Sequence, residues 1–227
     1  MAENSSLISS PAVAAQLTTT KLLVGEGKDE VQVFTALLKH LGIKDVQVEQ
    51  TGGKDNLRIY LKTLRLRDGF ADLTALGVIR DADNSASGAL QSVCDSLRNN
   101  GFPNPVKSGE IVAGSPSVGV MVVGDGDKFK MLEDLCLESV SHDAVWPCLA
   151  EFFACLKDAE CEPPNLSKAR FSTWMAIQTD ANARGLGGAA KHDYFLWDSE
   201  AFADLRNLLA TLFTNPLTDK GEASDES

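Results

Sequence analysis

The sequence has few of the side chains that mark a zinc site or a disulfide-rich fold. It contains only three histidines, which lie far apart, and none of its five cysteines belongs to a Cys-x-x-Cys pair. Since zinc is held by clustered Cys and His side chains, this distribution argues against a zinc site. The odd number of cysteines is typical of reduced thiols packed among apolar side chains, and we interpret them in that way.

Long apolar runs and an N-terminal export signal are also missing. Apolar residues make up 44% of the 227 residues, but no run is long enough to span a bilayer. The first segment, Met1 to Ser6, is polar and lacks the basic start of a secretory signal. We therefore expect a soluble globular protein that is cytoplasmic and has no membrane partner.

Basic residues are in deficit. The sequence has 21 Lys and Arg against 32 Asp and Glu, which gives a net charge of −11. Such a deficit argues against a broad electrostatic grip on nucleic acid, because phosphate contacts need a local excess of Lys and Arg. Part of the acidity lies in residues 215–227, which we expect to form a disordered acidic tail remote from any site. Bound cations would neutralise a further part.

Three acidic clusters stand at or just past the ends of apolar runs. The runs are 21–24, 75–79 and 118–123, and the clusters are Glu26 with Glu30, Asp81 with Asp83, and Glu133 with Asp134. Carboxylates gathered at one edge of a sheet repel one another unless a cation joins them. Because strand side chains alternate, Asp81 and Asp83 would leave their strand on the same side and converge on one ion. The clusters therefore predict a site for Mg²⁺ or Mn²⁺.

Predicted strands and helices alternate up to about residue 140. The apolar pattern predicts strands at 21–24, 45–50, 74–79 and 118–123, and helices at 29–41, 56–66 and 88–99. This order is typical of an α/β fold whose mostly parallel, Rossmann-like sheet is flanked by helices and binds ligands at its carboxyl edge. The remaining pattern is helical only, at 144–156, 166–178 and 200–213.

The chain divides accordingly into four segments. We predict a flexible N-terminal segment at 1–18, an α/β domain at 19–140, a helical extension packed on it at 141–214, and the acidic tail at 215–227.

The acidic motifs, in their order and context, resemble a TOPRIM domain, the metal-binding module shared by topoisomerases, primases and OLD nucleases. The resemblance rests on Glu26 in a Val-Gly-Glu-Gly-Lys segment and on the Asp-x-Asp of Asp81 and Asp83. Glu30 fills the place of the second acid of OLD-type members, and Glu133 matches a later acid in a Leu-Glu-Asp segment. The chain looks closest to the small stand-alone TOPRIM proteins of bacteria. It departs from the OLD pattern at Met131, where those nucleases often have serine.

The resemblance implies a TOPRIM domain at 19–140 and a metal-dependent phosphodiesterase that cleaves DNA or RNA, with phage defence as one role. The implied ligands of Mg²⁺ or Mn²⁺ are Glu26, Glu30, Asp81, Asp83 and Glu133. In OLD nucleases a later lysine helps to stabilise charge at the phosphate. Lys168 is the first candidate for this catalytic role beside Glu26, Glu30, Asp81 and Asp83, and Lys191 is the alternative.

The roles of several other residues can be interpreted in two ways. Lys28 and Lys191 are candidate nucleic-acid contacts, although Lys28 could equally relieve repulsion between Glu26 and Glu30, and Arg80 carries the same ambiguity. The Gly-rich segment 183–188 lacks both the Walker spacing and a preceding strand, so we interpret it as a helix terminator and loop. The weaker candidate acids are Asp29, Asp125, Asp127 and Asp134.

A second function stays open beside the nuclease. A non-catalytic or partner-dependent TOPRIM subunit would bind metal and a protein partner, or a second copy of itself. Met131 in place of serine, the acidic balance and the lack of a basic stripe favour this alternative. Strand transfer by a topoisomerase is disfavoured, because it needs a tyrosine nucleophile and only Tyr60 and Tyr194 exist.

Overall fold

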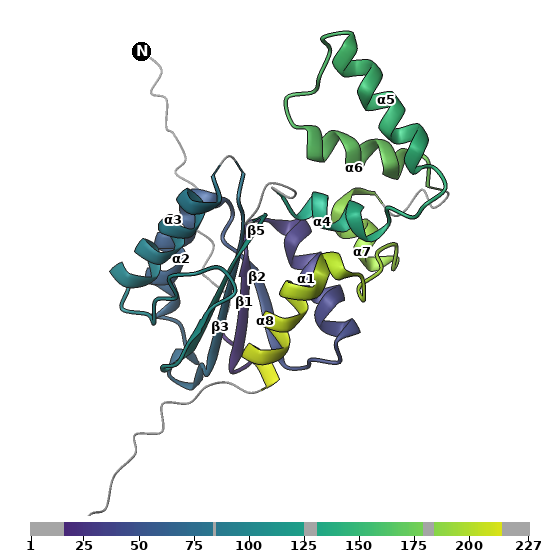
Figure 1. The fold of residues 1–227 in the computed structure, drawn as a ribbon. Coiled ribbons are helices and arrows are strands. Elements are labelled where there is room, and N and C mark those ends of the chain that lie inside the picture. Colours follow the sequence, from purple (N-terminus) through teal and green to yellow (C-terminus); the bar gives the residue numbers. More distant parts are fainter. Residues whose placement is uncertain (1–15, 84, 125–130, 179–183, 215–227) are drawn as a thin grey trace, which may run out of the picture.

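The computed structural model describes residues 16–83, 85–124, 131–178 and 184–214 (Figure 1). Most of the predicted N-terminal segment, the whole predicted tail and the weaker candidates Asp125 and Asp127 lie outside these residues.

A five-stranded sheet forms the centre of the molecule. Its strands are β1 (Lys21–Gly25), β2 (Val46–Gln50), β3 (Ala75–Asp81), β4 (Ile111–Val112) and β5 (Ser117–Val123), in the order β2-β1-β3-β5-β4. The pairs that join β2, β1, β3 and β5 are parallel, and β4 is antiparallel to β5. The predicted α/β class with a mostly parallel, Rossmann-like sheet is confirmed.

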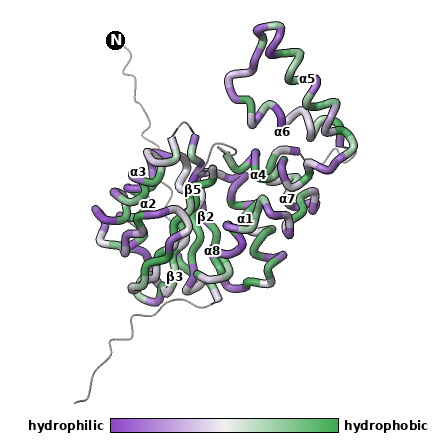
Figure 2. Tube along the Cα trace, in the orientation of Figure 1, coloured by the Kyte–Doolittle hydropathy of each residue, from purple (hydrophilic) through white to green (hydrophobic). Residues whose placement is uncertain are grey.

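Helices cover both faces of the sheet, because side chains alternate along each strand. On one face, α2 (Leu57–Leu64) and α3 (Ala86–Asn99) pack over Leu22 and Val24. On the other face, α1 (Lys28–His40) and α8 (Ala203–Thr214) pack over Leu23. Figure 1 shows these two layers, and Figure 2 shows apolar residues concentrated along the strands between them.

The remaining helices follow β5 in the chain. They are α4 (Leu132–Ser139), α5 (Trp146–Asp158), α6 (Leu166–Ala176) and α7 (Gly185–Lys191). Short 3₁₀ turns lie before β3, at Lys54–Asn56 and Phe70–Asp72, and before α8, at Glu200–Phe202. The α5–α6 pair stands clear of the sheet, whereas α7 lies along α1 (Figure 1). No helix of the described residues is both long enough and apolar enough to cross a membrane.

The glycine-rich segment is a helix, so our interpretation of residues 184–188 as a terminator and loop is wrong. Helix α7 begins at Gly185 and packs closely against α1. A Cβ added at Gly187 would lie 2.6 Å from Oε1 and 2.9 Å from Cβ of Gln32 on α1. Glycine lowers helix propensity, but here it allows two helices to approach, and this packing decides the structure.

Helix α8 fits the sheet at Gly77 on β3, which leads to a stability prediction. A Cβ at Gly77 would lie 2.6 Å from Leu23 Cδ1 and 3.3 Å from both Leu212 Cδ2 and Phe213 Cζ. We expect Gly77→Ala to lower the free energy of unfolding by about 1–3 kcal/mol in urea denaturation, because the packed core has no room for the methyl group. Adding Leu23→Val should recover part of this loss; losses that simply add would contradict the packing contact.

Candidate metal centre

The carboxyl ends of β1 and β3 form the crevice at which ligands bind in folds of this type. The chain passes from β1 to β2 on one side of β1 and then to β3 on the other, so the strand order reverses between β1 and β3. Such a switch point leaves an open crevice beyond the carboxyl ends of the two strands. Glu26 follows the last residue of β1, and Asp81 is the last residue of β3. The two acids therefore face one crevice.

Glu26 is half-buried next to Arg80 of β3. Arg80 Nε lies 3.3 Å from Glu26 Oε1, and these side chains are 11% and 22% exposed. Neither atom has a hydrogen-bond partner among the described residues, because the pair is close but poorly aligned. Burial raises the pKa of Glu26 above its usual value, the Arg80 charge opposes this rise, and Asp83 and Glu30 add to it. Glu26 thus keeps a buried oxygen available to a ligand.

Asp81 reaches the first turn of α4. Its Oδ1 accepts a hydrogen bond from the backbone N–H of Leu132 at 2.9 Å. Burial, followed by the charge of Glu133, raises the pKa of Asp81 to about 8, although the hydrogen bond opposes the shift. The hydrogen bond from Leu132 thus offsets only part of the effect of burial and of the neighbouring negative charges on this carboxylate.

Glu133 connects the crevice to the helical segment. Burial raises its pKa, Lys168 at the start of α6 opposes the rise, and Glu30 adds to it. Helix α6 begins at a cap in which Asn165 Oδ1 accepts from the N–H of Lys168 at 2.9 Å. The charge of the predicted catalytic lysine therefore acts on the predicted ligand Glu133.

Asp134 supports this arrangement from the side. Its Oδ2 accepts from the N–H of Met131 at 3.2 Å and from the hydroxyl of Ser167 on α6 at 2.9 Å. It holds the first turn of α4 to that of α6, and this contact gives it a positioning role. A serine hydroxyl is thus present near α4, although it comes from position 167 and not from 131.

Asp83 leaves the strand pattern that sequence alternation assumes. Its φ of +49° lies in the left-handed region, where the alternation of side chains no longer applies. Its Oδ2 lies 3.9 Å from Lys54 Nζ, and its charge still raises the pKa of Glu26. Asp83 is therefore part of the cluster but is turned toward the loop after β2.

The glycines on both sides of Glu26 leave space for Glu30 in the first turn of α1 to pack closely against the end of β1. A Cβ at Gly25 would lie 3.0 Å from the Cβ of Glu30, and one at Gly27 would lie 2.9 Å from Glu30 Oε2. Their absence of side chains lets Glu30 approach the end of β1. Asp29 in the same turn accepts instead from the N–H of Gly187 at 3.3 Å, so it anchors α7.

The two lysines predicted to bind nucleic acid line two different hollows. Lys28 lines a hollow beside Val48 and Gln50 of β2, and Lys191 lines a different one beside Trp197. Among the described residues neither lysine forms an ion pair with the cluster. Lys54 is the basic neighbour that motif reading misses, because it belongs to no acidic motif. The sequence could have indicated Lys54, because it follows β2 and the carboxyl end of β2 lies at the same edge of the sheet as those of β1 and β3.

The side chains of the crevice are of the type that binds a hard divalent ion, but their positions are not those of a formed ion site. Carboxylate oxygens are the ligands that Mg²⁺ and Mn²⁺ prefer, and Glu26 has one buried without a hydrogen bond. Yet no three Asp, Glu, His or Cys side chains of the described residues are grouped closely enough to hold an ion as they stand. Arg80, Lys54 and the N–H of Leu132 instead contact Glu26, Asp83 and Asp81.

Comparison with known proteins gives a family but no function. A family model described as "Protein of unknown function (DUF3226)" matches residues 20–214. No curated protein and no solved structure matches the chain.

Replacing Asp81 should stabilise the protein in the absence of divalent ions. The pKa of Asp81 is near 3.8 when unfolded and about 8 when folded, so its protonation favours folding at low pH and this advantage is lost as the pH rises through that interval. Asp81→Asn keeps an acceptor for the Leu132 N–H and carries no charge. We expect its free energy of unfolding to exceed that of the wild type by more than about 1 kcal/mol at pH 8.5 in EDTA.

The difference should grow between about pH 4 and 8 and then stay constant. Asp95→Asn is the matched control, because Asp95 pairs with Arg98 on the exposed surface of α3. A pH-independent difference for Asp81→Asn would contradict the buried, repelling environment of this carboxyl group.

Proposed function

Because the chain belongs to the DUF3226 family, whose function is unknown, we propose a function from its own geometry: a Mg²⁺- or Mn²⁺-dependent phosphodiesterase that cleaves DNA or RNA. One observation carries the proposal. The crevice between β1 and β3 gathers partly buried carboxylates whose pKa values are raised by burial and by one another's charge, and the charge of Lys168 opposes the rise at Glu133. Perturbed carboxyl groups in a crevice mark functional sites more often than structural ones. The motif order adds support, and we propose that residues 19–140 form a TOPRIM domain of the OLD type.

The proposed ligands are the acids of the crevice, namely Glu26, Glu30, Asp81, Asp83 and Glu133. A divalent ion bound there would polarise the phosphate, lower the pKa of a coordinated water and neutralise the leaving oxygen. Ion binding would also remove the repulsion that now raises the pKa of Glu26 and Asp81.

The chain's own groups have separate roles in this proposal. Lys168 brings a positive charge to Glu133, from which its ammonium group can meet a substrate phosphate whose negative charge grows in the transition state. Glu30 opens α1 at the same edge and is the candidate for holding a second ion or for removing a proton from the attacking water. Arg80 and Lys54 would hold Glu26 and Asp83 in place before the ion binds.

The two tyrosines have other partners, which argues against strand transfer. Tyr60 donates a hydrogen bond to Glu49, and burial raises its pKa above the usual value, so its phenolate is disfavoured. The ring of Tyr194 packs edge-on against Trp174. Among the described residues no hydrogen bond joins either hydroxyl to the acids of the crevice, and hydrolysis remains the proposed reaction.

A second candidate function is the partner-dependent subunit. The observation that favours it is the contact of Arg80 with Glu26, since an arginine can take the place of a cation permanently. In this case a protein partner, or a second copy of the chain, would complete the site. For either function we propose a cytoplasmic location. In support, all five cysteines are free thiols, and Cys94 and Cys136 are buried.

Cleavage assays with isosteric variants test the nuclease. We expect the wild type to cut plasmid DNA or structured RNA with Mn²⁺ or Mg²⁺ and not with EDTA. Glu26→Gln and Asp81→Asn should each lower the rate by about 100-fold or more, because each removes a carboxylate ligand. Asp95→Asn, outside the crevice, should keep full activity.

Calorimetry with Mn²⁺ distinguishes the two functions. Binding that is lost in Glu26→Gln, together with cleavage that begins only after a partner is added, would support the subunit. Cleavage that persists in both crevice variants would reject the site altogether.

Lys168 provides a separate prediction. We expect Lys168→Ala to lower kcat by about 10- to 100-fold with Mn²⁺ affinity unchanged or higher, because the lysine stabilises phosphate charge and does not bind the ion. Lys168→Arg should restore part of the rate. Lys157→Ala, at the exposed end of α5, is the matched control. Equal rates for Lys168→Ala and the wild type would remove this residue from catalysis.

A further inference from the structure

Strand β2 is an unprotected edge of the sheet. It pairs with β1 on one side, and no described strand pairs with it on the other. Natural edge strands are usually blocked by proline, by charged side chains or by a bulge. Val46–Gln50 contains no proline and no lysine, and its one charged side chain, Glu49, is paired with Arg67. The edge therefore remains open to a further strand.

The open main-chain groups can be assigned by alternation. The N–H of Gln47 donates to Thr19 Oγ1 at 3.2 Å, and that of Thr51 donates to Gly25 O at 2.9 Å, so the odd-numbered residues face β1. The N–H and C=O groups of Val46, Val48 and Gln50 consequently point outward. Within the described part of the chain they have no hydrogen-bond partner.

A groove runs beside this edge, between β2 and α1. One hollow of about 460 Å³ lies between Lys28, Val31 and Gln32 of α1 and the end of β2. A second, of about 430 Å³, lies between Thr35 and Lys39 of α1 and the start of β2. Val48 lines both hollows, and with Val46 it gives the groove an apolar floor. An extended peptide binds in such a place by main-chain pairing, with alternate side chains in the groove.

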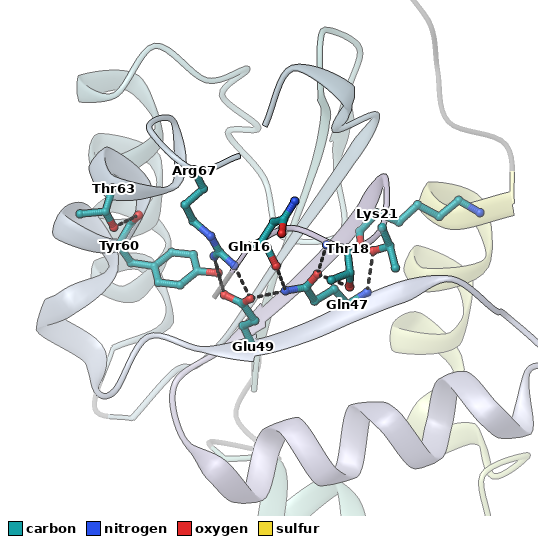
Figure 3. A network of polar contacts seen from close by, with 9 residues as sticks. Gln16, Thr18, Lys21, Gln47, Glu49, Tyr60, Thr63 and Arg67 are labelled. Carbon is teal, nitrogen blue, oxygen red and sulfur yellow. Dashed lines mark hydrogen bonds and ion pairs between the residues drawn. The ribbon is translucent and has the colours of Figure 1, made fainter. Parts of the chain in front are cut away.

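The charge of the groove is positive, although the chain is acidic. Lys28, Lys39 and Lys44 line it, and none of them has an ion pair among the described residues. The opposing charges are Asp45 at one end and Glu49 at the other. The carboxylate of Glu49 is held on the far face of β2, where Arg67 Nη1 and Nη2 each lie 2.7 Å from it (Figure 3).

These lysines argue against a second copy as the occupant. Two β2 edges paired antiparallel about a two-fold axis at Val48 would place Lys28, beside Gln50, across from Lys44 of the other copy, beside Val46. Like charges would then meet at both ends of the interface. Nucleic acid is also disfavoured, because no aromatic side chain lines the groove for a base to stack on.

We propose that the groove between α1 and β2 binds an extended acidic segment of a partner protein, which adds a strand to the β2 edge. The alternate side chains of the segment that enter the groove would be of two kinds: apolar ones that face Val46 and Val48, and acidic ones that meet the lysines. This site is independent of the metal centre and of the function proposed for it.

The probe is a labelled nine-residue peptide in which the alternate residues that face the groove are valine and glutamate in turn, and the remaining residues are threonine. We expect fluorescence anisotropy to show that it binds the full chain, and that hydrogen exchange followed by NMR becomes slower at the amides of Val46, Val48 and Gln50. Two N-methylated versions separate strand addition from simple charge attraction. Methylation of the amides on the pairing edge should abolish binding, whereas methylation of the alternate amides should leave it within about 2-fold.

Charge reversal completes the test. Lys39→Glu with Lys44→Glu should weaken binding by about 10-fold or more, and Lys62→Glu, on exposed α2, should leave it unchanged. Equal binding of the same peptide with lysine in place of glutamate, or tolerance of both N-methylated versions, would overturn the proposal. So would protection of these amides by a single-stranded oligonucleotide instead of the peptide, or binding that needs removal of residues 215–227. The last result would assign the groove to the chain's own tail.

Discussion

Repulsion among partly buried carboxylates is the constraint on which the carboxyl edge of this sheet depends. Glu26 and Asp81 come from adjacent parallel strands, and burial raises the pKa of both. Glu26 is paired with the charge of Arg80, and Asp81 accepts a hydrogen bond from the first turn of α4. The close fit of α1 at Gly25 and Gly27 brings Glu30 to the same edge. Such a concentration of acids costs stability, which is typical of a site kept for function.

The sequence is sufficient to predict most of this framework. Apolar runs followed by helical patterns place β1, β3 and β5 correctly, and the rule that parallel strands share a carboxyl edge brings Glu26 and Asp81 together. These predictions succeed because they depend on local periodicity and on topology. Strand β4, with only two residues, has no such signal.

The rest depends on tertiary packing that composition does not reveal. Helix α7 contains three glycines and forms because Gly187 lets it approach Gln32. The left-handed turn at Asp83 defeats strand alternation, and the contact of Lys54 with Asp83 follows from the path of the loop after β2. Propensities and motifs depend on residues that are close in the sequence. The approach of α7 to α1 and the contact of Lys54 with Asp83 each depend on two segments that are distant in the sequence.

The contact between Ser167 and Asp134 joins the α5–α6 pair to the first turn of α4. Helix α6 packs on α4 and α7 with Phe171 and Trp174 in the core, and its first turn is tied through Asp134 to the turn that carries Glu133. The first turns of α4 and α6 therefore cannot separate without breaking the hydrogen bond between Ser167 and Asp134.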